Sequence, residues 1–140
     1  MNNLLIVWND SNNLGIGIID EQHRGIVSTI NSLHYIIRTD QTDKLFPSIV
    51  KTIEDYTKTH FATEEIILKA SKYPDFEKHK SFHEKLKQLT FAVSKESELL
   101  DHPLKFLDFL KDWWMNHINK NDRAYADHVK KYIKEQGLQL

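Results

Sequence analysis

Residues 20–38 read DEQHRGIVSTINSLHYIIR, and this stretch indicates the fold class. Its apolar side chains recur every three or four residues, the period of a helix with one buried stripe. They are Ile26, Val27, Ile30, Leu33 and Ile37. Asp20 stands at the start of the stretch and is expected to be the N-cap, because aspartate caps helices well. The sequence therefore predicts an amphipathic helix over 20–38.

The same period returns in three further stretches. We expect helices over 43–70, 75–99 and 104–134, separated by short polar or proline-containing breaks. The chain has only 4 Gly and 3 Pro in 140 residues, a composition typical of long helices with few turns. Four helices joined by short turns favour an all-α, up-down-up-down four-helix bundle. We expect a single domain over residues 1–140, with residues 1–19 as an N-terminal arm.

Composition and charge exclude several classes of protein. The absence of cysteine excludes disulfides, iron–sulfur clusters, zinc–thiolate sites and thiol nucleophiles. The 19 Lys+Arg and 20 Asp+Glu give a net charge of −1, so the chain offers no basic surface for nucleic acid. No segment approaches the roughly 20 apolar residues of a membrane span, and the N-terminus lacks the pattern of a signal peptide. We therefore expect a cytoplasmic protein.

The spacing of the histidines is the second informative pattern, because the chain has 8 of them. His60 and Glu64 stand four residues apart, as do His79 and His83. Side chains at this spacing project from the same face of a helix, so each pair could bind one metal ion. A single such pair is more often an ordinary surface or core feature, and the position of the other histidines therefore matters.

His117 and Asp122 form a third pair, but they stand five residues apart. On an ideal α-helix they would diverge by roughly 140°. We expect a π-bulge or a loosened turn near 117–122, a distortion that concentrates at functional sites.

The bundle topology brings these pairs to one level. Early residues of odd-numbered helices share a layer with late residues of even-numbered ones, and His23 is early in the first helix. One layer near one end of the bundle should therefore hold His23, His60, Glu64, His79, His83, His117 and Asp122. We expect the remaining histidines to be structural or solvated, namely His34, His102 and His128. We expect four aromatic residues to lie in the core, namely Phe82, Phe106, Trp113 and Trp114.

Five imidazoles and two carboxylates exceed what one tetrahedral zinc ion uses. They suit two six-coordinate first-row ions with bridging carboxylates, and iron fits such ligands well, although manganese and zinc stay open. Glu65 is an alternative to Glu64 as the bridge, but it would point about 100° away on the helix. Because ligation needs neutral imidazoles, we expect metal loss as the pH falls near 6 and below.

Four stretches resemble the hemerythrin family, in its single-domain bacterial form. They are Gly17-Ile18-Ile19-Asp20-Glu21-Gln22-His23, His60-Phe61-Ala62-Thr63-Glu64-Glu65, His79-x-x-x-His83, and Trp113-Trp114-Met115-Asn116-His117-Ile118 through Asp122. Each stretch alone is a weak signal, whereas the ordered set is highly specific. The likeness extends over nearly the whole chain and includes Trp8 in the arm.

The resemblance implies two iron ions (Fe2+/Fe3+), bridged by an oxo or hydroxo group, that bind dioxygen reversibly. It implies that the two irons are bridged by the carboxylates of Glu64 and Asp122. One iron would be bound by His79, His83 and His117, and the other by His23 and His60. Dioxygen would bind at an open position of the second iron. The resemblance therefore implies a carrier of oxygen rather than an enzyme. An oxygen-using enzyme is a candidate partner that would receive the gas from it. We expect a monomer or a weak oligomer.

The sequence departs from the family at one position of the ligand pocket. The family commonly has leucine three residues before the histidine that matches His117, whereas this chain has Trp114. We predict that Trp114, together with Ile118, lines the pocket and narrows it or reshapes the entry of the ligand.

Other functions on the same centre stay open. A redox enzyme is one, although the bundle di-iron oxidases use a Glu-x-x-His repeat that this sequence lacks. A di-iron sensor of oxygen or nitric oxide is another, and it would need a separate partner to pass on its signal. A metal-independent bundle is disfavoured, because it would bury several unpaired polar groups at a high cost in free energy.

Overall fold

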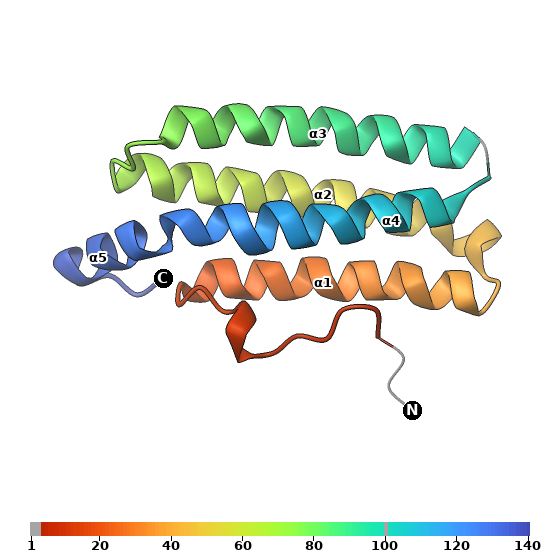
Figure 1. Ribbon diagram of the computed structural model, residues 1–140, viewed down its shortest axis with the longest axis horizontal. Coiled ribbons are helices and arrows are strands. Elements are labelled where there is room, and N and C mark those ends of the chain that lie inside the picture. Colours follow the sequence, from red (N-terminus) through yellow and green to blue (C-terminus); the bar gives the residue numbers. More distant parts are fainter. Residues whose placement is uncertain (1–3, 100) are drawn as a thin grey trace.

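The computed structural model describes residues 4–99 and 101–140, except for the side chain of His117, so residues 1–3 of the predicted arm lie outside it. The long helices lie side by side in alternating directions (Figure 1). They are α1 (Gly17–Arg38), α2 (Thr42–Ala70), α3 (Phe76–Leu99) and a fourth rod that starts with α4 (Pro103–Trp113). Both α1 and α3 pack against α2 and α4. The predicted all-α four-helix bundle is therefore confirmed.

The fourth rod changes its helix type along its length. After α4 come a π-helix, η2 (Trp114–Asn121), a 3-10 turn, η3 (Asp122–Tyr125), and α5 (Ala126–Gln136). The distortion expected near 117–122 is thus a full π-helix followed by a tighter turn. None of the described helices is long and apolar enough to cross a membrane.

The start of α1 differs from the prediction. The helix begins at Gly17 and its N-cap is Ile16, so Asp20 is not the cap. Instead, the buried Asp20 carboxylate binds the preceding loop, accepting hydrogen bonds from the backbone N–H groups of Leu14 (2.7 Å) and Gly15 (3.1 Å). Asp20 still lies in the first turn, where a negative charge is favourable. Its carboxylate ties the arm to the bundle.

The N-terminal arm runs along α1 and is fixed at two further points (Figure 1). The backbone N–H and C=O of Ile6 both pair with the side-chain amide of Asn31, each at 2.9 Å. The Arg123 guanidinium donates to the backbone carbonyl of Ser11 at 2.7 Å. The arm, which carries Trp8 between these points, is therefore part of the packed structure.

The turns between helices use non-glycine residues with positive φ, namely Asp40 (59°), Lys72 (57°) and Asp101 (50°). This backbone region is uncommon outside glycine, although aspartate is enriched there. The low glycine content of the chain is thus compatible with short, sharp reversals.

The buried apolar side chains form two clusters with a polar layer between them. The helices α1 and α2 and the fourth rod each contribute to both clusters, with Ile26, Phe61 and Ile118 in the larger one and Ile19, Ile67 and Tyr125 in the smaller one. Between these apolar positions lie the buried polar residues His23, Glu64 and Asp122, which mark the polar layer. Burying polar groups in this way is costly unless they are paired with one another or with a metal.

Candidate metal centre

Six of the seven predicted ligand side chains meet in the polar layer. They form two groups whose ligand atoms lie within 4.8 Å of one another: His23, His60, Glu64 and Asp122; and Glu64, His79, His83 and Asp122. The helices α1, α2 and α3 and the turn η3 supply them. The seventh residue, His117, has its backbone in η2, and its side chain lies outside the described residues.

The two carboxylates are shared, and each directs its two oxygens to different groups. Asp122 Oδ2 lies 3.1 Å from His23 Nε2 and 3.3 Å from His60 Nε2, while Asp122 Oδ1 lies 3.3 Å from His79 Nε2. Glu64 Oε1 contacts His60 Nε2. Glu64 Oε2 lies 2.8 Å from His79 Nε2 and 3.3 Å from the Nε2 atom of His83. This division is the arrangement that two carboxylates bridging a pair of metal ions would need.

Without metal, protons balance the buried negative charge. Burial lowers the pKa of His60, but the charge of Glu64 and hydrogen bonds to Asp122 and Glu64 outweigh it and raise the pKa to about 10. Burial also lowers the pKa of His79, but hydrogen bonds to Asp122 and Glu64 outweigh this effect and raise the pKa to about 9. Burial and the charge of Asp122 raise the pKa of Glu64, but His60 and His79 outweigh them and lower the pKa to about 2. The two buried carboxylates are thus stabilised by positive charge nearby. Metal cations could supply this charge in place of the protons, because imidazole nitrogens and carboxylate oxygens are suitable metal ligands.

The comparison with known families identifies the kind of domain. Residues 14–129 match the family described as "Hemerythrin HHE cation binding domain". The chain belongs to the hemerythrin family. The resemblance seen in the sequence is therefore confirmed.

Three named relatives align with most of this chain. The bacteriohemerythrin of Stenotrophomonas maltophilia is 33% identical over 135 residues, covering 94% of this chain and 86% of that protein. The bacteriohemerythrin of Pseudomonas aeruginosa is 35% identical over 137 residues, covering 93% and 85%. The myohemerythrin of Theromyzon tessulatum is 30% identical over 122 residues, covering 84% and 88%. A crystal structure of a hemerythrin with one leucine replaced by alanine matches with a TM-score of 0.78 at 27% identity, covering 90% of this chain and 98% of that one.

Two residues of this hemerythrin domain accept hydrogen bonds from histidines of the two groups at the ring nitrogen that faces away from the two shared carboxylates, and sequence reasoning did not find this role. Gln22 Oε1 accepts a hydrogen bond from His60 Nδ1 at 3.0 Å. Glu65, the alternative bridge, instead accepts from His83 Nδ1 at 3.1 Å, so Glu64 is the carboxylate within the layer. Both contacts join neighbouring helices, and residue spacing along one helix does not reveal them. Such partners fix the ring orientation of ligand histidines.

The π-helix η2 explains how the awkward spacing near Asp122 is accommodated. Its hydrogen bonds span five residues rather than four, so it holds more residues per turn than an α-helix. Three asparagines in this segment lower the preference for an α-helix: Asn116, Asn119 and Asn121. Asp122 therefore enters the layer although the preceding rod starts as a regular helix.

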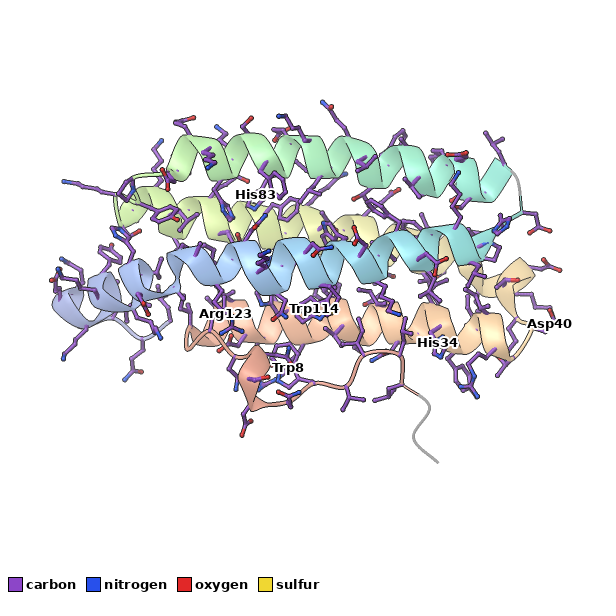
Figure 2. All side chains as sticks on the ribbon, viewed as in Figure 1. Trp8, His34, Asp40, His83, Trp114 and Arg123 are labelled. Atoms are coloured by element: carbon purple, nitrogen blue, oxygen red, sulfur yellow. The ribbon has the colours of Figure 1, made fainter. Side chains whose placement is uncertain are left out.

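Trp114 and Ile118 are both fully buried, with 1% and 0% of their surfaces exposed. The Trp114 ring lies edge-on to His23, with 5.6 Å between the ring centroids. The ring of Trp8 from the arm also contacts it, with 5.9 Å between the ring centroids (Figure 2). Trp114 thus borders the group that contains His23 and His60.

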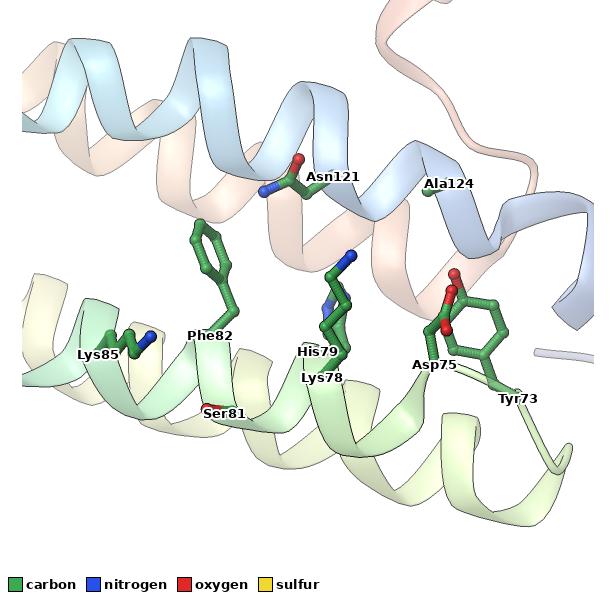
Figure 3. A pocket seen from close by; sticks show the side chains of 9 residues that line it. All are labelled: Tyr73, Asp75, Lys78, His79, Ser81, Phe82, Lys85, Asn121 and Ala124. Carbon is green, nitrogen blue, oxygen red and sulfur yellow. The ribbon is translucent and has the colours of Figure 1, made fainter.

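A cavity of about 440 Å³ lies on another side of the centre, between α3 and the segment η2–η3 (Figure 3). Its walls include His79, Phe82 and Asn121. Phe82 is 37% exposed here, so its expected place in the core is wrong. His79 is 9% exposed, whereas the other five described residues of the two groups are at most 1% exposed. Among the described residues of the two groups, His79 is therefore the one most accessible to water.

The three remaining histidines take no part in the two groups. His34 is half-buried and His102 is exposed. His128 Nε2 donates to the backbone carbonyl of Ser71 at 2.7 Å, which gives it a structural role at the end of α2.

Proposed function

We propose that this protein is a cytoplasmic oxygen carrier, a monomer or weak oligomer, that binds dioxygen reversibly at a non-haem di-iron centre. The proposed ligands are His23, His60, Glu64, His79, His83, His117 and Asp122. The observation that carries the proposal is the division of each carboxylate's two oxygens between two histidine groups. Membership of the hemerythrin family supports iron as the metal and dioxygen as the ligand.

The protein's own groups would create an asymmetric pocket. His117 would add a third imidazole to the group of His79 and His83, which leaves fewer protein ligands in the group of His23 and His60. The open position would then lie on the side of Trp114, whose ring borders His23. The buried indole and Ile118 would keep water away from this position. Iron bound at this centre would supply the electrons for reversible dioxygen binding. The proposed recipient of the released dioxygen is an oxygen-using enzyme.

The proposal is tested by the absorbance spectrum of the iron-loaded protein. The protein is reduced without oxygen, opened to air and deoxygenated again. We expect a visible band that appears in air and disappears on deoxygenation, over several cycles. Conversion in air to a ferric form with no reversible stage would contradict the carrier function and favour a redox or sensing role.

The Trp114→Leu variant tests how the indole controls access to the pocket. We expect oxygen association and autoxidation to become about tenfold faster, equivalent to a barrier lower by about 1.4 kcal/mol, because the smaller side chain opens the space beside His23. Stopped-flow and autoxidation time courses measure both rates. Trp113→Leu is the matched control, since Trp113 is also buried but packs against Phe61. Equal rates in Trp114→Leu and the unmodified protein would refute the role of Trp114.

A further inference from the structure

His60 and His83 each donate a hydrogen bond from Nδ1 to a side chain on a neighbouring helix, and the two acceptors differ in charge. Behind His60 is the neutral amide of Gln22, with Nδ1 and Oε1 3.0 Å apart. Behind His83 is the carboxylate of Glu65, with Nδ1 and Oε2 3.1 Å apart. The two rings are fully buried, and each belongs to a different one of the two ligand groups. The contacts are otherwise alike in distance, so charge is the main difference between them.

A chain of hydrogen bonds fixes the orientation of the Gln22 amide. The Thr63 hydroxyl donates to the backbone carbonyl of Thr59 at 2.9 Å, so its oxygen accepts from Gln22 Nε2 at 3.0 Å. The amide oxygen must then face His60, and His60 Nδ1 carries the proton that it donates. His60 Nε2 is left to face the two carboxylates of the centre.

The Glu65 carboxylate is an acceptor only, so His83 Nδ1 also carries its proton and Nε2 faces Glu64. A hydrogen bond to a carboxylate is roughly twice as strong as one between neutral groups. It draws the Nδ1 proton further from the ring and makes the opposite nitrogen a stronger electron-pair donor. His83 is therefore a stronger donor toward the centre than His60.

We propose that Glu65 and Gln22 make the two halves of the centre electronically unequal, so that the half containing His83 favours the higher oxidation state. Glu65 and Gln22 are positioning and tuning residues that act through His83 and His60. This inference rests on the proposed metal centre. It predicts that the iron beside His83 is the harder of the two to reduce, each iron taking up one electron from an electrode to pass from Fe3+ to Fe2+.

Two isosteric variants, Glu65→Gln and Gln22→Glu, test the inference by spectroelectrochemical titration. In Glu65→Gln, we expect the lower of the two midpoint potentials to rise by about 59 mV, a tenfold change in a one-electron equilibrium. In Gln22→Glu, we expect the higher potential to fall by a similar amount. Glu77→Gln, at an exposed site on α3, is the matched control and should leave both potentials unchanged.

A second readout uses the zinc-loaded protein and needs neither iron nor oxygen. In its proton NMR spectrum, we expect the Nδ1–H resonance of His83 to lie downfield of that of His60. Glu65→Gln should move the His83 resonance upfield and leave His60 in place, and Gln22→Glu should move the His60 resonance downfield.

Unchanged potentials and resonances in both variants, with both metal ions still bound, would overturn the inference while leaving the oxygen carrier intact. The reverse result, shifted resonances in a protein whose spectrum shows no reversible oxygen cycle, would support unequal donors and reject the carrier. A chain that binds no zinc or iron would overturn both.

Discussion

Replacing Asp122 by alanine should reduce the metal content of the reconstituted protein from about two ions per chain to one or none. The reason is the sharing of this carboxylate, whose two oxygens face different histidine groups. Its loss removes a proposed ligand from both halves at once and takes away one of the two carboxylates that face the buried imidazoles. Metal analysis after loading with Fe2+ and dialysis gives the measurement.

The Asp108→Ala variant is the control for this experiment. Asp108 lies on α4 but is exposed to solvent, so its removal should leave the metal content unchanged. Glu64→Ala should behave like Asp122→Ala, because Glu64 also serves both groups. Two tightly held ions in either ligand variant would contradict the shared-carboxylate centre.

The apparent affinity for metal should rise steeply with pH. Without metal, His60 and His79 hold protons because the neighbouring carboxylates raise their pKa values to about 10 and about 9. Each ion that binds must displace one of these protons, so its apparent affinity should increase about tenfold per pH unit between pH 6.5 and 9. Competition with a chelator of known pH dependence measures the slope for zinc. A flat profile over this range would contradict the assignment of these two histidines.

The metal-free protein should show the opposite trend in stability. Since the pKa values of His60 and His79 are raised on folding, their contribution is complete below about pH 6.5 and is lost as the pH rises through 9 to 10. The lowered pKa of Glu64 adds stability above about pH 4.5 that is lost as the pH falls toward 2, and the lowered pKa of Asp122 acts in the same direction. The thermal midpoint in a chelator should therefore decrease from pH 6.5 to 10. An increase over that interval would refute this account.

Periodicity predicted the bundle because each long helix needs one buried face, and residues such as Ile26 and Ile30 mark that face in the sequence itself. The proposed ligands on α2 and α3 were equally visible, since spacing by four residues is a local property. Asp20 was misassigned because a cap and a carboxylate that binds the preceding loop have the same sequence signal. Phe82 was placed in the core because aromatic character alone does not show that a cavity lies beside it.

The roles of Gln22 and Glu65 depend on a different kind of information. Each is hydrogen-bonded to a histidine on another helix, so its partner is set by helix rotation and packing distance rather than by sequence spacing. The same holds for Trp8, which meets Trp114 only because the arm folds along α1. Such contacts between elements are available only from a three-dimensional structure.

The π-helix makes the chain length between Trp114 and Asn121 a functional quantity. If this segment wound as an ordinary α-helix at its present length, positions 117 and 122 would diverge by roughly 140°. Asp122 would then turn out of the layer while the apolar faces of α1, α2 and α3 stayed intact. Removing one residue between positions 117 and 122 would reduce their spacing to four, which an α-helix holds on one face. For anyone transplanting this bundle or shortening it, the residue count and the helix type of the segment must therefore change together or not at all.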